Sequence, residues 1–223
     1  MARQLRLTLK RRVAQRREDY AVGPSNAAAV AALDAWPAWH AGCLALVGPE
    51  GVGKSHLAQA WAAKAGAVRL DREDPDVSAA AGRPALVEDV DQGVSEEALF
   101  HLINMAGREG GGLLLTARTP PASWPAALPD LRSRLNALPV GLIEEPDDIV
   151  LEAVLRRLFA ERSIRPSEDI YPYLLRRMPR SAIHAREIVR RLDESADERQ
   201  RPVSRALARE VLGDGADNLD LFD

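Results

Sequence analysis

The 223-residue sequence is poor in the residues that build disulfide and metal frameworks. Its one cysteine, Cys43, excludes an internal disulfide, and the place of this residue at the head of an apolar segment predicts a small buried side chain. The four histidines are scattered, and neither a His-Glu-x-x-His nor a Cys-x-x-Cys pattern occurs. We therefore expect no metal site built from protein ligands alone.

Long apolar runs and a strong charge imbalance are also missing. No run approaches the about 20 apolar residues that a membrane helix needs, and no apolar signal core follows the basic amino terminus. A cytoplasmic protein without membrane contact is expected. With 30 basic and 33 acidic residues the formal net charge is −3, so the molecule as a whole does not attract nucleic acid. The first 19 residues are locally basic, which is typical of a solvated tail.

A glycine-rich segment with P-loop spacing follows the first strongly apolar run. Its three glycines let the backbone curl and direct N–H groups at one anion, and the helix expected directly after them adds the positive end of its dipole. Lys54 would then reach the β and γ phosphates of a nucleotide, and Ser55 the magnesium ion. The alternative is a glycine-rich turn that matches by chance. The residues assigned to the nucleotide here are Gly48, Pro49, Glu50, Gly51, Val52, Gly53, Lys54, Ser55 and His56.

Apolar strands alternate with helical patterns up to residue 145. Such alternation predicts an α/β fold with a parallel sheet sandwiched by helices. An alanine-rich helix is expected after a turn at 23–26. The other expected elements are strands at about 43–47, near Val68, and at 85–87, 113–115 and 139–143, and helices at about 54–65 and 95–108.

From Pro146 onward the pattern is entirely helical. Apolar residues recur at helical spacing in three stripes, and Ser204 is placed to cap a fourth helix through Leu207 and Val211. The second stripe comprises Tyr171, Leu174, Leu175 and Met178. We therefore expect a basic tail over 1–18, an α/β nucleotide-binding domain over 19–145, a small helical lid domain over 146–214 and an acidic tail over 215–223.

Acidic and polar residues follow two of the expected strands. A P-loop needs a carboxylate at the end of a neighbouring strand to hold magnesium through its water shell, and Glu88 and Asp89 supply one. Thr116 ends the next strand, where it is placed to sense the γ phosphate. The alternatives are an acidic strand-to-loop turn and an ordinary strand-end threonine. Asp91 is interpreted as a turn residue.

Two arginines, Arg132 and Arg134, precede the last expected strand. Arginine keeps its charge and binds two phosphate oxygens at once, so it suits the stabilisation of transferred charge from a neighbouring subunit. On residue type alone these arginines are more often surface residues.

Taken in order, these motifs resemble the AAA+ ATPases of the DnaA branch, and within it the Hda regulators, which inactivate the replication initiator DnaA. GPEGVGKSHL is similar to the Walker A motif of that branch, LVEDVD to Walker B, and LLLTARTPP to the sensor I strand. AVGPSN is similar to the segment that frames adenine, which implies base contacts by Val22 and Gly23. LPDLRSRL is similar to box VII, which puts Arg134 at the arginine finger. The resemblance thus implies catalytic roles for Arg134, Asp89 and Thr116.

Three departures from the family pattern bear on hydrolysis. Walker B has Glu88-Asp89 in place of two aspartates, and Arg118 stands where an acidic residue is usual after sensor I. The sensor II arginine falls on Ile183, and Arg180, three residues earlier on the same expected helix face, is its substitute. We therefore expect ADP or ATP with Mg²⁺ to bind and intrinsic ATPase activity to be weak or absent.

The basic tail resembles the peptide by which Hda docks on the DNA sliding clamp, with Gln4, Leu5, Leu7 and Leu9 as its contacts. A disordered basic tail is the alternative. The segment 218–222, Asn-Leu-Asp-Leu-Phe, is a second candidate clamp peptide. Because the sequence ends without a helix-turn-helix domain, sequence-specific duplex binding is not expected.

The leading hypothesis is a negative regulator of replication initiation that binds the sliding clamp and stimulates hydrolysis of DnaA-bound ATP. The expected partners are the clamp and DnaA, at the replisome or nucleoid, and a homodimer is left open. A self-sufficient AAA+ ATPase that loads or remodels replication proteins and a nucleotide-stabilised clamp adaptor are the competing hypotheses. A small-molecule kinase is the least favoured.

Overall fold

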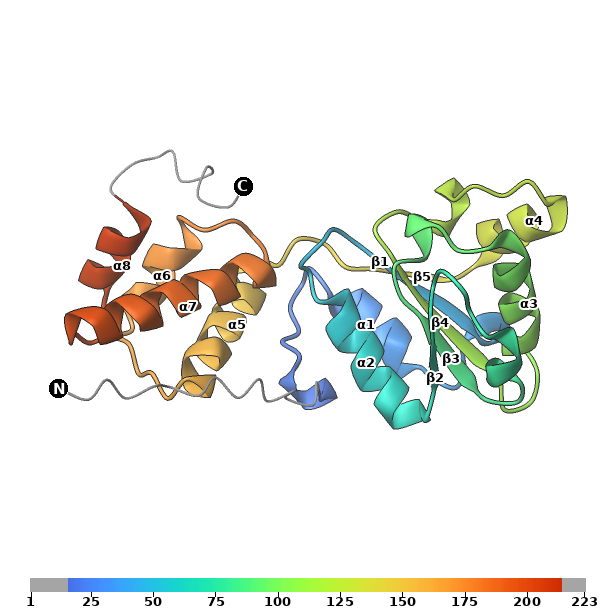
Figure 1. The fold of residues 1–223 in the computed structure, drawn as a ribbon, viewed down its shortest axis with the longest axis horizontal. Helices are drawn as coiled ribbons and strands as arrows, with labels where there is room; N and C mark the ends of the chain where they lie inside the picture. Colours follow the sequence, from blue (N-terminus) through green and yellow to red (C-terminus); the bar gives the residue numbers. More distant parts are fainter. Residues whose placement is uncertain (1–15, 214–223) are drawn as a thin grey trace.

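The computed structural model describes residues 16–213 and contains one five-stranded sheet in the order β2-β3-β4-β1-β5, with every neighbouring pair parallel (Figure 1). The predicted clamp contacts Gln4, Leu5, Leu7 and Leu9, and the segment 218–222, lie outside the described residues. The strands are β1 (Cys43–Val47), β2 (Val68–Leu70), β3 (Pro84–Val87), β4 (Gly112–Ala117) and β5 (Val140–Leu142).

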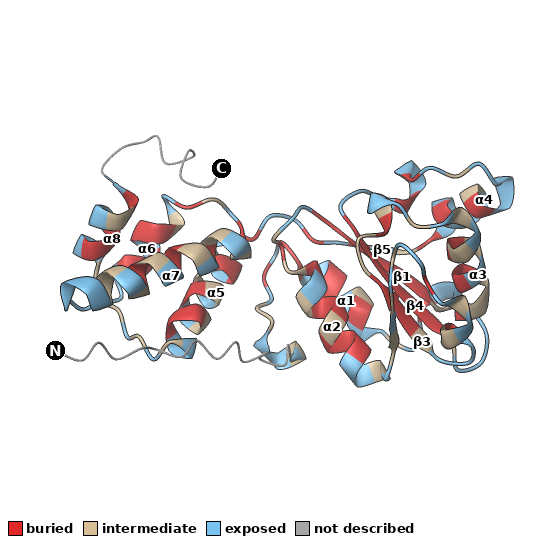
Figure 2. Ribbon diagram, in the orientation of Figure 1, coloured by how far each residue is buried: buried red, intermediate tan, exposed pale blue. Residues whose placement is uncertain are grey.

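Helices cover both faces of this sheet, as the alternating pattern predicts. The helices α1 (Ala27–Asp34) and α2 (Lys54–Ala65) pack on one face, and α3 (Glu96–Ala106) and α4 (Pro129–Ala137) pack on the other. The strands β1 and β4 are buried along their whole length, which explains their uninterrupted apolar sequences (Figure 2). The α/β fold is therefore confirmed, and Cys43 is buried as expected.

Three tryptophans form a cluster on the α1–α2 face of the sheet. The ring centroids of Trp36 and Trp39 are 4.8 Å apart, and Trp61 of α2 lies 5.1 Å from Trp39 and 5.3 Å from Trp36. The fourth tryptophan, Trp124, is buried in the core on the opposite face. The two faces thus have separate aromatic cores.

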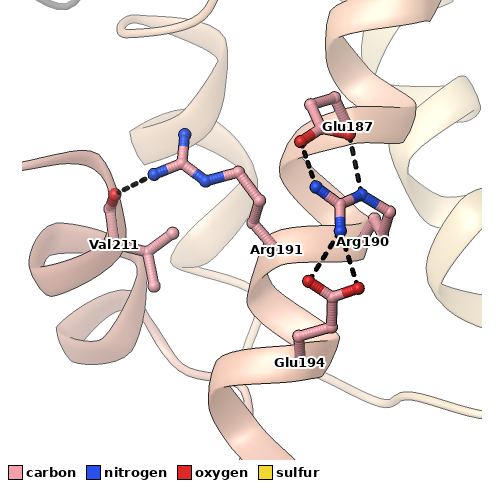
Figure 3. A network of polar contacts seen from close by, with 5 residues as sticks. All are labelled: Glu187, Arg190, Arg191, Glu194 and Val211. Atoms are coloured by element: carbon pink, nitrogen blue, oxygen red, sulfur yellow. Dashed lines mark hydrogen bonds and ion pairs between the residues drawn. The ribbon is translucent and has the colours of Figure 1, made fainter. Parts of the chain in front are cut away.

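The carboxyl-terminal helices form their own apolar core and a lobe beside the sheet (Figure 1). They are α5 (Asp148–Glu161), α6 (Ile170–Leu175), α7 (Ala182–Arg199) and α8 (Arg205–Leu212). Arg191 of α7 donates to the carbonyl oxygen of Val211 at 2.9 Å, and its neighbour Arg190 bridges Glu187 and Glu194 (Figure 3). These contacts fix α8 against α7 and strengthen the exposed side of α7.

Several expected element ends differ by a few residues from those observed. Ser204 caps α8 as predicted, its hydroxyl oxygen accepting from the Leu207 amide. The second helical stripe is shorter than predicted: α6 ends at Leu175, and Met178 is buried from the turn that follows. Pro179 explains this, because the residue before a proline disfavours the helical conformation. Among residues 16–213, no helix is long and apolar enough to cross a membrane.

Candidate nucleotide site

The predicted phosphate loop connects the carboxyl end of β1 to the first turn of α2. Gly51 and Gly53 have φ values of +76° and +98°, a backbone conformation that favours glycine. A Cβ atom on Gly48 would lie 2.1 Å from the carbonyl oxygen of Ile143, so the loop also needs glycine for space. Gly53 is the N-cap of α2 and offers no side chain to cap it, and uncapped helix N–H groups bind anions. The loop therefore fits a phosphate chain.

Lys54 is buried at the mouth of the loop. Its ammonium group donates to the carbonyl oxygens of Gly48 and Pro49, both at 2.7 Å. Burial lowers the pKa of Lys54, and among the neighbouring charges Asp89 opposes that shift most strongly. Ser55 follows on the exposed side of the same helix turn. A cation and an exposed hydroxyl group thus occupy the first turn of α2.

The two acidic residues after β3 point to different partners. The Asp89 amide donates to Oγ1 of the fully buried Thr116 at 3.0 Å, which brings the ends of β3 and β4 together beside Lys54. The Glu88 carboxylate instead accepts from Gln59 of α2 at 3.5 Å and from Arg69 of β2 at 3.4 Å. Glu88 also borders a 340 Å³ cavity formed with residues 69–73. The Glu88 carboxylate is therefore held by Gln59 and Arg69, whereas the charge of Asp89 acts on Lys54.

The loop after β4 is held by Asp91, which the sequence predicts to be a turn residue. One oxygen of its carboxylate accepts from the amides of Arg118 and Thr119, at 2.9 and 3.0 Å. The Arg118 guanidinium lies 2.8 Å from the Glu50 carboxylate in the phosphate loop. This ion pair joins the end of β4 to the loop.

The side of the loop assigned to adenine contains one residue that the sequence did not reveal, Tyr20. Its hydroxyl group donates to the Val52 carbonyl oxygen at 3.3 Å, and its ring would lie 2.9 Å from a Cβ atom on Gly53. Burial raises the pKa of Tyr20 to about 12. No motif includes this tyrosine; the Asn26 amide donates to its hydroxyl at 3.5 Å, but its contact with the phosphate loop spans 32 positions, so only the fold reveals that contact.

The other residues assigned to this side lie close to Tyr20. The His56 ring is 5.4 Å from the Tyr20 ring, and its Nε2 atom lies 3.0 Å from the Arg16 carbonyl oxygen. Val22 is exposed, and the Gly23 amide donates to Asn26 at 3.0 Å. Through Tyr20, the His56 ring at the start of α2 is thus linked to the segment assigned to adenine, in which Val22 is exposed.

The helical lobe contacts the phosphate loop through the start of α7. The Ala182 amide donates to the Gly51 carbonyl oxygen at 3.0 Å, and a Cβ atom on Gly51 would lie 2.2 Å from the Ser181 hydroxyl oxygen. Ile183 is about half exposed beside Gly51. The lobe therefore contacts the phosphate loop directly at Gly51.

The predicted placement of Arg180 on the helix face of Ile183 is wrong. Ser181 is the N-cap of α7, so Arg180 precedes the helix. The rule that residues i and i+3 share a helix face therefore does not apply to Arg180 and Ile183. Its guanidinium donates to the Pro146 carbonyl oxygen at 3.1 Å and to Asp148 at 2.7 Å. The side chain is thus held at the start of α5.

The two arginines of α4 have different environments. Arg132 donates to the carbonyl oxygens of Ala122 and Trp124, at 3.1 and 2.8 Å, and so holds the loop that precedes its helix. Arg134 is exposed and lies over the Phe100 ring, 5.4 Å from its centroid. Only Arg134 is therefore available to a second molecule.

Arg134 also lies far from the phosphate loop of its own chain. It acts electrostatically on Cys43, which begins β1, whereas the loop follows Val47 at the other end of that strand. At ~3.3 Å per residue, about 13 Å of strand separates Cys43 from Val47. In addition, α4 and α2 pack on opposite faces of the sheet.

Comparison with known proteins supports this description of the fold. No protein-family model matches the sequence. Over 89% of its length the chain is 25% identical to the chromosomal replication initiator protein DnaA of Thermomicrobium roseum, and it covers 49% of that protein. The chain thus spans about half the length of the curated relative that it matches.

Solved structures with a similar fold include domain III of Thermotoga maritima DnaA, with a TM-score of 0.74, 19% identity, and coverage of 90% of this chain and 96% of that one. A variant of Thermotoga maritima RuvB has a TM-score of 0.71 and 14% identity, covering 92% and 74%. DnaA from Aquifex aeolicus bound to AMPPCP has a TM-score of 0.64 and 18% identity, covering 82% and 68%. The chain has the AAA+ P-loop fold and is similar in sequence to DnaA.

Proposed function

We propose that this DnaA-like AAA+ protein is an Hda-type regulator, which binds an adenine nucleotide and uses Arg134 to stimulate hydrolysis of ATP held by DnaA. The observation that carries the proposal is the position of Arg134, exposed on α4, which packs on the sheet face opposite α2, the helix that begins at the phosphate loop of its own chain. A guanidinium so placed acts on a nucleotide bound by another molecule.

The bound nucleotide is ADP or ATP with Mg²⁺. Its phosphates supply the negative charge that the loop is shaped to hold, and Mg²⁺ binds with them. Lys54 and the first N–H groups of α2 bind the phosphates, and Ser55 and Asp89 orient the magnesium. Thr116 holds Asp89 in place through its hydroxyl oxygen. Support for an adenine nucleotide comes from the similar fold of the AMPPCP-bound DnaA.

The proposed partners are DnaA and the sliding clamp. The clamp contacts are Gln4, Leu5, Leu7 and Leu9, and their assignment rests on the sequence. Bringing the protein to the clamp raises its local concentration at the site of DNA synthesis. The outcome is negative regulation of replication initiation, because DnaA is left with ADP.

The test is hydrolysis of DnaA-bound ATP in the presence of DNA-loaded clamp, with wild-type protein, Arg134→Ala and a control, Arg108→Ala, which removes another exposed arginine. An arginine supplied in trans is worth about 10³ to 10⁵ in rate, so Arg134→Ala should return hydrolysis to the rate of DnaA alone. Arg108→Ala should stimulate like wild type. Full stimulation by Arg134→Ala would overturn the proposal.

A self-sufficient AAA+ ATPase is the second candidate, because Lys54, Asp89 and Thr116 form one continuous group beside the loop. ATP hydrolysis by the protein alone distinguishes the two. Turnover without DnaA or clamp, abolished by Lys54→Ala and unaffected by Arg134→Ala, would favour this second function. The adaptor hypothesis requires instead that Lys54→Ala leaves activity intact while Gln4→Ala with Leu5→Ala abolishes it.

A further inference from the structure

A second cation, Arg118, lies at the mouth of the phosphate loop beside Lys54. Its guanidinium pairs with Glu50, which belongs to the loop itself, at 2.8 Å. Its positive charge also acts on Lys54, where it adds to the effect of burial in lowering the pKa. Two positive side chains, one from the start of α2 and one directly after β4, therefore converge on the loop.

The backbone of Arg118 is fixed, whereas its side chain can move. The Asp91 carboxylate accepts from the Arg118 amide at 2.9 Å and from the Thr119 amide at 3.0 Å. The side chains of Arg118 and Glu50 are 50% and 63% exposed. An ion pair so exposed to water holds its members weakly, so a phosphate group with two or more negative charges competes well for the guanidinium.

Arg180, the arginine that the sequence assigns to the nucleotide, is directed elsewhere. It is bound to Pro146 and Asp148 at the start of α5. Ile183, which lies next to the loop, brings an apolar side chain. Within residues 16–213, Arg118 is thus the arginine that an ion pair joins to the phosphate loop.

We propose that Arg118 binds the terminal phosphate of a nucleoside triphosphate, and that Glu50 holds the same guanidinium when a diphosphate is bound. Arg118 is then a specificity-determining residue of the site, and Glu50 competes with the terminal phosphate for it. The inference rests on the proposed binding of an adenine nucleotide by the loop, but not on the proposed action of Arg134.

The experiment measures the dissociation constants of AMPPCP and ADP, each with Mg²⁺, by calorimetry on the full chain. Arg118→Ala should weaken AMPPCP by about 10-fold or more, the value of one charge-assisted hydrogen bond, and change ADP by less than about 2-fold. The affinity of Arg118→Lys for AMPPCP should lie between those of wild type and Arg118→Ala, because lysine keeps the positive charge and loses the bidentate geometry of the guanidinium. Arg83→Ala, whose guanidinium contacts the Gly66 carbonyl oxygen beyond the far end of α2, is the matched control.

Removing the competitor gives a second, independent test. Glu50→Gln should tighten AMPPCP and leave ADP unchanged, and this gain should disappear in the Arg118→Ala background, as a double-mutant cycle reveals. The assignment would be overturned if Arg118→Ala weakened the binding of AMPPCP and ADP equally. It would also be overturned if Arg180→Ala, and not Arg118→Ala, selectively weakened the binding of AMPPCP.

These results are separable from the test of Arg134. Selective loss of AMPPCP with Arg118→Ala, together with full DnaA stimulation by Arg134→Ala, would refute the regulatory function and retain the role of Arg118. Wild-type protein that binds neither nucleotide would refute both proposals.

Discussion

Gly51→Ala, in the loop that meets α7, should destabilise the protein through two separate effects. The residue has φ +76°, and holding alanine there costs about 1–2 kcal/mol. The new Cβ atom would lie 2.2 Å from the Ser181 hydroxyl oxygen, so the start of α7 must move away. That movement breaks the hydrogen bond from Ala182 to Gly51, worth about 1 kcal/mol. The expected loss is about 2–3 kcal/mol in the free energy of unfolding.

Ser181→Ala separates the two effects. By itself it removes the cap of α7, at a cost of about 1 kcal/mol. Combined with Gly51→Ala it also removes the clashing oxygen, after which the nearest atoms are those of Ile183 at 3.3 Å. The double variant should therefore lose about 1 kcal/mol less than the sum of the losses of the two single variants. Urea unfolding followed by circular dichroism measures all four proteins. Strict additivity would refute the packing of α7 against the loop.

Three further predictions follow from the contacts around the site. Tyr20→Phe should lower the free energy of unfolding by about 0.5–1 kcal/mol, the value of one hydrogen bond, whereas Tyr20→Ala should also weaken ADP binding in calorimetry. If both variants bind ADP like wild type, Tyr20 does not support the loop. Arg132→Ala should leave three carbonyl oxygens without this donor and speed proteolysis of the loop before α4, with no change in nucleotide affinity. For Cys43, burial raises the pKa from 9.0 to about 12, so its contribution to stability is complete below pH 9 and declines as pH rises from 9 toward 12. The native thiol should resist iodoacetamide at pH 9 and react once urea unfolds the protein, and a Cys43→Ala variant should lose stability less steeply over that pH range.

The phosphate loop and its surroundings were predictable because the signals are local. The apolar run of β1, the glycine spacing and the first residues of α2 are contiguous in the sequence, and the structure confirms the sheet implied by the alternation of strands and helices. That Glu88 and Asp89 point to different partners can also be predicted from the sequence. Side chains alternate across a strand, so Glu88 shares the α2 face with Leu86.

Other features depend on contacts that no local pattern encodes. Arg180 was misplaced because the start of α7 depends on Ser181, and a shift of the cap by one residue removes the preceding residue from the helix face. Tyr20 acts across 32 positions, and the Arg118–Glu50 pair across 68. The Arg118–Glu50 pair forms because the strand order places the ends of β1 and β4 side by side.

The tryptophan cluster gives the protein an intrinsic optical signal for events at the phosphate loop. Trp61 lies on α2, the helix that begins at the loop, and its ring contacts Trp36 and Trp39, which lie outside that helix. Movement of α2 changes the spacing of these rings and hence the emission of the cluster. Trp124, on the opposite face of the sheet, emits from a core that α2 does not enter and so serves as an internal reference. Nucleotide titrations can therefore be followed in unlabelled protein, and Trp61→Phe should remove the response while leaving the reference emission.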